Sequence, residues 1–214
     1  MNVLVVGANG QVGKLLVNLL RDNKEHTVKA LVRKEEQADA LKKMDIEVSV
    51  ACLEQSVEDI AQAARGCNAI VFTAGSGRLT GYDKTLLIDL DGAVKTIEAA
   101  ELIGIKRFIM VSAIQAHRRE NWHEKMLPYY AAKYYADKML EQSELTYTII
   151  RPGGLLNEPG TGMITAADDI RSGKIPREDV ANTIIQSLTE ENTYYQSFDL
   201  VAGNVPIRKA LTLL

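Results

Sequence analysis

The chain has 214 residues, 46% of them hydrophobic and 25% charged, which suits one globular domain and leaves no room for a second large one. Its net charge is −3 at pH 7 without a long basic block, so nucleic acid is not expected as a partner. Two cysteines and three histidines without paired-ligand spacing predict neither a disulfide framework nor a metal site. No apolar run approaches the roughly 18 residues of a membrane span. Since no signal-like segment stands at the start, we expect a cytoplasmic protein without a membrane partner.

Short β-branched runs alternate with longer stretches of helical periodicity, a pattern typical of βαβ units and a mostly parallel sheet. The predicted strands are 3–6, 27–32, 47–50, 69–73, 107–111, 147–151 and 197–201. Apolar stripes at helical spacing are expected to pack on the sheet: Val12/Leu15/Leu16/Leu19/Leu20, Ile60/Ala63/Ala64 and Leu86/Leu90/Val94/Ile97. We therefore expect an α/β fold in which residues 1–214 form a single domain. Its sheet should be doubly wound, mostly parallel and Rossmann-type, with a small C-terminal lid.

The first predicted strand runs directly into a glycine-rich segment of G-x-x-G-x-x-G spacing, after which a helical pattern begins. Glycine permits a tight turn and lets a pyrophosphate approach the backbone, while the next helix offers free N–H groups and a partial positive charge. Because the segment follows a strand and opens a helix, it predicts dinucleotide binding. The candidate cofactor contacts in it are Gly7, Asn9, Gly10, Gln11, Val12 and Gly13.

The residues after the second predicted strand indicate which dinucleotide is bound. An NAD site usually has an acidic residue about 20 positions past the loop, to bind the ribose 2′-hydroxyl. Arg33 and Lys34 stand there instead, and two cations suit the 2′-phosphate of NADP. The alternative is that both are ordinary surface charges, and that Glu35 or Glu36 folds back onto the ribose of NAD.

Three segments that follow predicted strands interrupt the alternation: 75–85, 113–127 and 153–176. Ligands bind outside the carboxyl ends of the strands in an open α/β sheet, so these segments are expected to form the walls of a site. The last one is rich in glycine, and we predict that it is a mobile cover over the site.

A candidate catalytic set follows the fifth predicted strand. Ser112 stands at its end, and seventeen residues later come Tyr129 and Lys133, four positions apart on one helix face. A nearby ammonium favours the phenolate and lowers the pKa of a tyrosine, which makes it a proton donor and acceptor near neutrality. The serine hydroxyl can then hold a substrate carbonyl oxygen.

A second pair, Tyr134 and Lys138, has the same spacing on the same helix. On a helical wheel, Tyr129 lies within about 35° of the centre of an apolar stripe and Lys133 at its edge, whereas the second pair lies on the far side. The stripe consists of Ala132, Ala136, Met139 and Leu140. The wheel therefore favours Tyr129 and Lys133. The alternative is that Tyr129 is only a packed aromatic residue and Lys133 a surface lysine.

Several motifs spread over nearly the whole chain resemble one protein family. They are Gly7/Gly10/Gly13, Arg33, Thr73-Ala74-Gly75, Lys106-Arg107-Phe108-Ile109 before Ser112, Tyr129 with Lys133, Tyr147–Gly153 (YTIIRPG) and Arg177–Ala181 (REDVA). With these the chain resembles an atypical short-chain dehydrogenase/reductase, close to the extended and NmrA-like branches. The YTIIRPG stretch is the most diagnostic of them.

The resemblance implies further cofactor contacts. Lys133 would also hold the nicotinamide ribose, Thr73, Ala74 and Gly75 would line the cofactor, and the backbone of Pro152, Gly153, Gly154 and Leu155 would pass beside the nicotinamide. Cys52 and Leu53 stand where such proteins commonly carry Asp-Leu, whose aspartate contacts the adenine.

The expected function is therefore the NADP-dependent reduction of a small carbonyl, quinone or flavin-type substrate, with Tyr129 as the general acid. The alternative is a non-catalytic NADP-binding redox sensor. Only 61 residues follow Gly153, too few for the second nucleotide site of a nucleotide-sugar epimerase or dehydratase. Tyr130 and Tyr134, on the outer side of the predicted helix, are candidates for a contact in a homo-oligomer.

Overall fold

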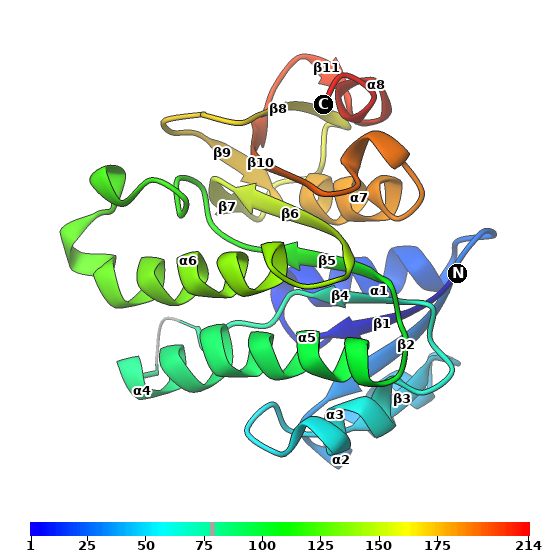
Figure 1. Cartoon of the computed structure of the whole chain (residues 1–214). Coiled ribbons are helices and arrows are strands. Elements are labelled where there is room, and N and C mark those ends of the chain that lie inside the picture. Colours follow the sequence, from blue (N-terminus) through cyan, green and yellow to red (C-terminus); the bar gives the residue numbers. More distant parts are fainter. Residues whose placement is uncertain (78–79) are drawn as a thin grey trace.

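The computed structural model describes residues 1–77 and 80–214. Figure 1 shows its strands and helices, coloured along the chain. The strands are β1 (Asn2–Val6), β2 (Thr27–Val32), β3 (Glu47–Val50), β4 (Ala69–Phe72), β5 (Arg107–Val111), β6 (Thr146–Pro152), β7 (Gly154–Leu156), β8 (Met163–Ala167), β9 (Lys174–Pro176), β10 (Gln196–Ala202) and β11 (Val205–Pro206). The α-helices are α1 (Gln11–Arg21), α2 (Glu35–Lys42), α3 (Val57–Ala64), α4 (Tyr82–Lys84), α5 (Gly92–Leu102), α6 (Leu127–Glu141), α7 (Arg177–Ser187) and α8 (Ile207–Leu211), with a π-helical segment η1 (Thr85–Asp91). Short 3-10 turns cover Arg119–Asn121, Glu124–Met126 and Glu191–Thr193.

The main sheet has the strand order β11-β8-β10-β6-β5-β4-β1-β2-β3. Neighbouring strands from β3 to β10 are parallel, and β8 is antiparallel to both β10 and β11. The order reverses between β1 and β4, which is where a doubly wound sheet opens a crevice for a ligand. All seven predicted strands are present, each within one residue of its predicted bounds, so the predicted α/β fold with a mostly parallel, doubly wound sheet is confirmed.

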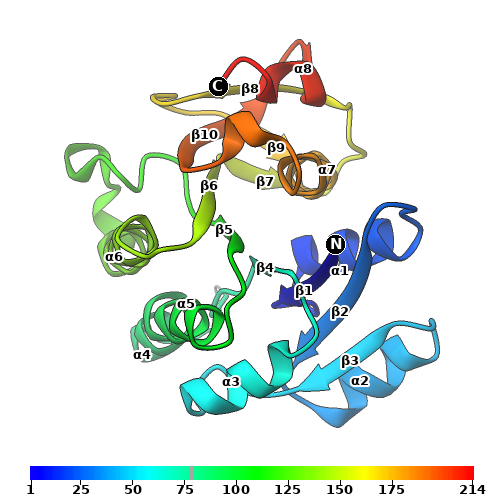
Figure 2. The same cartoon turned by 45° about the vertical axis from the view of Figure 1, so that its right-hand side comes forward.

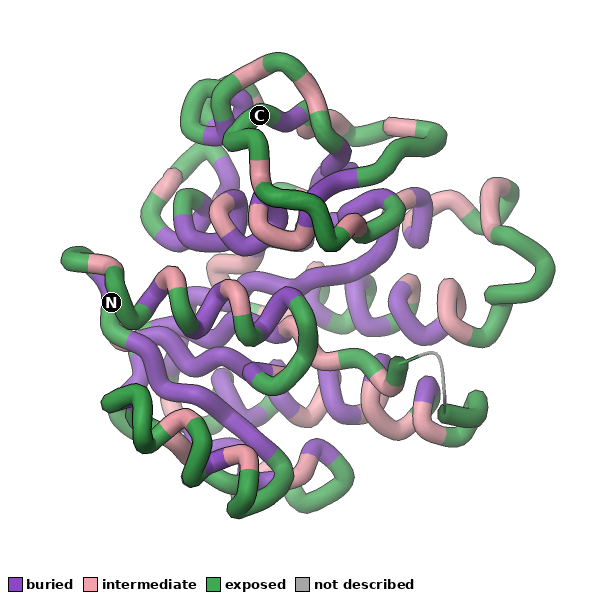
Figure 3. Tube along the Cα trace, turned by 180° about the vertical axis from the view of Figure 1, so that it is seen from behind, coloured by how far each residue is buried: buried purple, intermediate pink, exposed green. Residues whose placement is uncertain are grey.

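Helices cover both faces of the sheet. α1 and α7 pack on one face, and α3, α5 and α6 lie on the other (Figure 2). Along β1, Val3 and Val5 point to the first face and Leu4 and Val6 to the second, as the two-residue period of a strand requires. Seen from behind, the buried strands run between helices whose outer surfaces are exposed (Figure 3). No helix in the described residues is long and apolar enough to cross a membrane.

Parts of the segment 153–176 are anchored. β7 and β9 pair as a small parallel sheet, and β8 joins the main sheet beside β10. The buried Asp179 carboxylate accepts hydrogen bonds from the N–H groups of Thr161 at 2.9 Å and Gly162 at 2.8 Å. Strand pairing and a buried carboxylate hold parts of this segment. Its mobility and its role as a cover both stay predictions.

Residues 82–102 form one helical run in which the π-helical η1 separates α4 from α5. Of the apolar stripe predicted to pack on the sheet here, Ile97 is buried, whereas Leu86 is 56% exposed. Leu86, Leu90 and Val94 instead line an outer groove of about 830 Å³ against Tyr134 and Met139 of α6. The wider π turn changes which side chains face inward, so the predicted packing is wrong for Leu86, whereas Leu90 still packs partly against the core. Met139, assigned to the inward stripe of α6, is likewise exposed.

Arg107 joins three elements at the start of β5. Its guanidinium donates to the carbonyl oxygens of Ser187 and Leu188 at the C-terminal end of α7, and to that of Thr146, the first residue of β6, at 2.8 Å. The side chain is buried, and burial lowers the pKa of Arg107 to about 10, so it is still a cation at neutral pH. A cation at this end of α7 also complements the helix dipole.

We expect Arg107→Met to lower the free energy of unfolding by about 3 kcal/mol, because buried carbonyl groups lose charge-assisted hydrogen bonds. Urea denaturation measures the loss. Lys106→Met, at the exposed neighbouring position, is the control and should stay within about 0.5 kcal/mol of the unsubstituted protein. Equal losses in the two variants would contradict this role of Arg107.

Candidate active site

Three glycines shape the loop after β1. Gly7 has a φ of +85°, and a Cβ added there would lie 2.6 Å from the backbone N of Ala74. A Cβ at Gly13 would lie 2.2 Å from the Gly7 carbonyl oxygen, so α1 can approach the loop only without a side chain at this position. Gly10 is the N-cap of α1, and its N–H donates to the Gly7 carbonyl oxygen at 2.9 Å. Because these three positions are glycine, they place no side chain over the backbone where α1 begins.

This cradle fits the pyrophosphate of a dinucleotide. The N-terminus of α1 has no capping side chain and no acidic residue in its first turn, so its free N–H groups and the helix dipole favour an anion. Asn9 and Gln11 are exposed beside Gly10, whereas Val12 is buried. A contact from Val12 to the cofactor would therefore come from its backbone.

Arg33 and Lys34 follow β2, the strand next to β1 in the sheet, and both side chains are exposed. Lys34 is the N-cap residue of α2. In residues 1–77 and 80–214, neither side chain forms an ion pair, so both charges are available to a phosphate. Glu35 and Glu36, in the first turn of α2, are also exposed.

The other predicted cofactor residues lie at the carboxyl ends of further strands. After β3, the Cys52 N–H donates to the Gln55 side chain at 2.7 Å, while Leu53 is buried against Gly92. After β4, the Thr73 hydroxyl donates to the Val6 carbonyl oxygen at 2.9 Å, which fixes the start of the 73–75 segment against β1.

The same edge of the sheet includes the end of β6. Pro152 and Gly153 are buried, and the Gly153 N–H donates to the Leu200 carbonyl oxygen at 2.9 Å. Gly154 and Leu155 are exposed. A Cβ at Gly153 would lie 2.4 Å from the Gly173 carbonyl oxygen, so this turn also needs glycine.

The structure distinguishes the two tyrosine–lysine pairs of α6. Lys133 is 3% exposed and its Nζ lies 6.0 Å from the centre of the Tyr129 ring. Lys138 is exposed and pairs with Glu141 at 2.6 Å. The predicted inward direction of Lys133 is therefore confirmed, whereas the catalytic roles of Tyr129 and Lys133 remain predictions.

The electrostatics of this pair differ from the prediction. The Lys133 Nζ donates to the Val111 carbonyl oxygen at 3.2 Å and lies 3.6 Å from Asp89 Oδ1 on η1. Burial, and next to it the Asp89 charge, raise the pKa of the Tyr129 phenol far above its usual value. The predicted lowering of this pKa is wrong, because burial disfavours the phenolate and the nearby Asp89 charge does so too. The sequence feature that could have indicated this role of Asp89 is its position as an acidic residue within an apolar helical run.

Ser112 lies at the end of β5 as predicted, but its hydroxyl donates to Asp137 Oδ2 at 2.9 Å. Asp137 is buried, also pairs with the Nε of Arg151 at 3.1 Å, and burial raises the pKa of its carboxyl to about 6. Holding a substrate carbonyl therefore requires the Ser112 hydroxyl to turn away from Asp137. The sequence patterns did not predict a role for Asp137, although it lies one helical turn beyond Lys133 on the same face.

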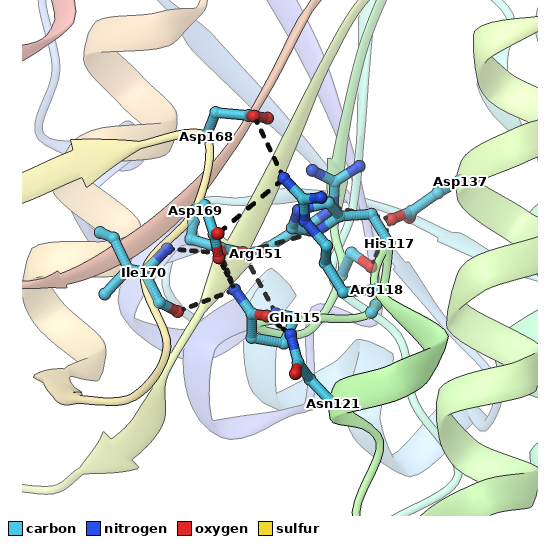
Figure 4. Close-up of polar contacts among 12 residues, drawn as sticks. Gln115, His117, Arg118, Asn121, Asp137, Arg151, Asp168, Asp169 and Ile170 are labelled. Atoms are coloured by element: carbon cyan, nitrogen blue, oxygen red, sulfur yellow. Dashed lines mark hydrogen bonds and ion pairs between the residues drawn. The ribbon is translucent and has the colours of Figure 1, made fainter.

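Gln115, three residues after Ser112, connects the 113–127 segment to residues 169 and 170 and to Asp199 of β10. It has a φ of +60°, is 3% exposed, and its side-chain amide donates to Asp169 at 2.8 Å and to Asp199 at 2.9 Å. Figure 4 shows it between Asn121 and the 168–170 segment, with Arg118 directed at Asp168 and Asp169. A left-handed, buried glutamine is costly, and such strain is commonly found at functional sites. Nothing in the local sequence indicates this contact.

Aromatic side chains cover the amino-terminal half of α6. Trp122 stacks on Tyr130 at 6.0 Å between ring centres and meets the edge of Tyr134 at 5.8 Å, and its ring N–H donates to the Ala116 carbonyl oxygen at 2.9 Å. Tyr130 and Tyr134 are therefore half-buried against the 113–127 segment. Nearby, burial and the Arg151 charge lower the pKa of His117.

Comparison with known proteins agrees with this geometry. A family model described as NAD(P)H-binding matches residues 7–191. The chain is 62% identical to a Bacillus subtilis protein named uncharacterized sugar epimerase YhfK, over the full length of both. Among solved structures, it is similar to a putative NAD-dependent epimerase/dehydratase of Bacillus halodurans, with 43% identity, a TM-score of 0.93 and complete coverage of both chains. It is also similar to the oxidoreductase ylbE of Lactococcus lactis, with 32% identity, a TM-score of 0.90 and coverage of 100% of this chain and 96% of that one.

The glycine cradle predicts a difference between two left-handed glycines. Gly7→Ala should weaken NADPH binding at least tenfold by calorimetry, because its Cβ would collide with Ala74 and reshape the loop. Gly66→Ala is the control, since Gly66 has a φ of +82° and nothing within 4 Å of an added Cβ. It should cost about 1 kcal/mol of stability and leave binding unchanged. Equal binding losses would show that backbone strain, rather than the cradle, is being measured.

Proposed function

The chain belongs to the NAD(P)H-binding protein family, and on that premise we propose that it is an NADPH-dependent oxidoreductase that reduces a small carbonyl, quinone or flavin-type substrate. The observation that carries the proposal is that the bare phosphate cradle and Tyr129, with the buried Lys133 one helical turn beyond it, lie at one edge of the sheet. Continuous contacts connect them: Gly7 touches Ala74, the Ser76 N–H donates to Asp89, and Asp89 pairs with Lys133.

When bound, NADPH would supply the hydride that the carbonyl carbon of the substrate accepts. Tyr129 donates its phenolic proton to the carbonyl oxygen, so that the C=O double bond becomes an alcohol. We assign Lys133, one helical turn from Tyr129, to the nicotinamide ribose and to stabilisation of the phenolate that remains. Ser112 is assigned to the carbonyl oxygen.

Arg33 and Lys34 support the choice of NADP, because two exposed cations follow the second strand where an NAD site needs an acceptor.

We expect NADPH to bind more tightly than NADH by calorimetry, and Arg33→Ala to remove most of the difference, about tenfold or more in affinity. Lys24→Ala, at another exposed position, is the control and should preserve the preference. Equal affinities for the two cofactors in the unsubstituted protein would contradict the assignment.

The test of the reductase itself is a screen of aldehydes, ketones, quinones and flavins for NADPH consumption, followed by substitution of the two tyrosines. Tyr129→Phe should lower kcat by a factor on the order of 10² or more, the scale of a lost general acid. Tyr134→Phe should leave kcat nearly unchanged. Comparable losses in both variants would remove Tyr129 from the reaction.

Two other functions are outcomes of the same screen. A non-catalytic NADP sensor is favoured by one observation: Lys133 and Ser112 already have partners in Asp89 and Asp137. NADPH binding without turnover, combined with a protein partner that binds according to the NADP redox state, would replace the reductase with the sensor. An epimerase is suggested by the names of two relatives, one of which names a sugar epimerase, and epimerisation of a sugar without net NADPH consumption would identify it.

A further inference from the structure

Asp89 is a buried carboxylate in the middle of the π-helical segment η1, with 1% of its surface exposed. Its two oxygens have different partners. Oδ1 lies 3.6 Å from the Lys133 Nζ, and Oδ2 accepts a hydrogen bond of 2.9 Å from the Ser76 backbone N–H. Asp89 therefore contacts both α6 and the segment after β4.

Gly75 and Ser76, in the segment after β4, both lie close to the Asp89 carboxylate. A Cβ at Gly75 would lie 3.1 Å from Asp89 Oδ1, so a side chain there would press on the oxygen that faces Lys133. The Ser76 hydroxyl lies 3.3 Å from that of Thr85, at the first residue of η1. Single π-helical turns occur frequently at functional sites. In this one, the Asp89 carboxylate lies beside the Lys133 ammonium of the candidate active site.

The charged and titratable groups that act on Tyr129 are Asp89 from η1 and Tyr130, Lys133 and Asp137 from α6. Lys133 is the cation among them, and its charge is compensated by Asp89. The phenol therefore lies near an ion pair instead of near an isolated ammonium. Burial then favours the neutral phenol over the phenolate.

We propose that Asp89 is a positioning residue of this site: it holds the Lys133 ammonium and the Gly75–Ser76 backbone together, and it thereby keeps Tyr129 in the protonated form that donates. The proposal rests on the proposed function only where Tyr129 acts as the acid. Tyr129 is then ready to donate up to alkaline pH. Without the carboxylate, the lysine charge acts on the phenol alone and stabilises the phenolate.

Asp89→Asn separates the two contacts of the carboxylate, because the amide oxygen still accepts from Ser76 while the charge facing Lys133 is lost. Tyrosinate absorbance is followed against pH, with Tyr129→Phe introduced into each protein to isolate the signal of Tyr129. We expect the Tyr129 midpoint to fall by on the order of one pH unit or more. The alkaline limb of the kcat/KM profile for reduction should move in the same direction.

Asp91→Asn is the matched control. Asp91 lies two residues further on the same segment, is half-exposed, and pairs with Lys95 at 2.8 Å. It should leave the Tyr129 midpoint unchanged. Asp89→Glu, which retains the charge, should restore a midpoint close to that of the unsubstituted protein, a rescue that a purely structural role would not produce.

A single variant that leaves a buried lysine without its partner can fail to fold. The double variant Asp89→Asn/Lys133→Met removes both charges, and its Tyr129 midpoint is then compared with that of Lys133→Met. Removing Asp89 should still lower the midpoint in this background. An unchanged midpoint in folded Asp89→Asn, or an equal shift in Asp91→Asn, would overturn the proposal. The titration needs no substrate, so failure to find turnover would count against the reductase while leaving the result for Asp89 intact.

Discussion

The close approach of the Gly7 and Ala74 backbones, at the point where the strand order reverses, is the constraint on which the site depends. It requires a bare, left-handed residue at the end of β1 and fixes the segment after β4 beside the N-terminus of α1. That segment in turn meets Asp89, and Asp89 meets Lys133. A series of backbone and ionic contacts thereby connects the glycine cradle to Lys133, whose Nζ lies 6.0 Å from the centre of the Tyr129 ring.

The face of the sheet beneath α6 is unusually polar for a core. Arg151 and Asp199 are paired in register on β6 and β10, and the Ser112 N–H donates to the carbonyl oxygen just before Arg151, so the three residues form a row that is buried under the helix. Buried charges lose their hydration and rarely stabilise a fold more than apolar residues of the same size would. Their value here is geometric, because Asp137 orients both Ser112 and Arg151 while Asp199 fixes the loop at Gln115.

The sequence predicted those structural features that depend on the residues of one short segment alone. Seven strands followed from β-branched runs, the phosphate loop from glycine spacing, and the inward direction of Lys133 from the helical wheel. β8 was missed because its five residues include two alanines and because its partner, β10, is distant in sequence. The π turn shifted the register of an otherwise regular helix, which reversed the expected direction of Leu86.

The residues missed at the site share one property: their roles arise from contacts between distant segments. Asp89 and Lys133 are far apart in the chain, as are Gln115 and Asp199, and no periodicity joins them. The pKa of Tyr129 was predicted in the wrong direction because the sequence showed the lysine four residues away, but neither the burial of the phenol nor the Asp89 carboxylate. Local patterns therefore predicted which residues gather at the edge of the sheet, but not the charges they have there.

The position of β1 in the sheet also has a consequence for how the protein assembles. The first strand of the chain is an inner one, paired with β2 on one side and with β4 on the other. The edge of β1 that pairs with β4 stays open until residues 69–72 have been synthesised. The last parallel strand of the sheet, β10, pairs with β6 and lies within the last 20 residues of the sequence. Parallel pairs of such separation close large loops and form slowly. During translation, the edge of β1 that pairs with β4 therefore stays open for tens of residues, and an open apolar strand edge is prone to aggregation.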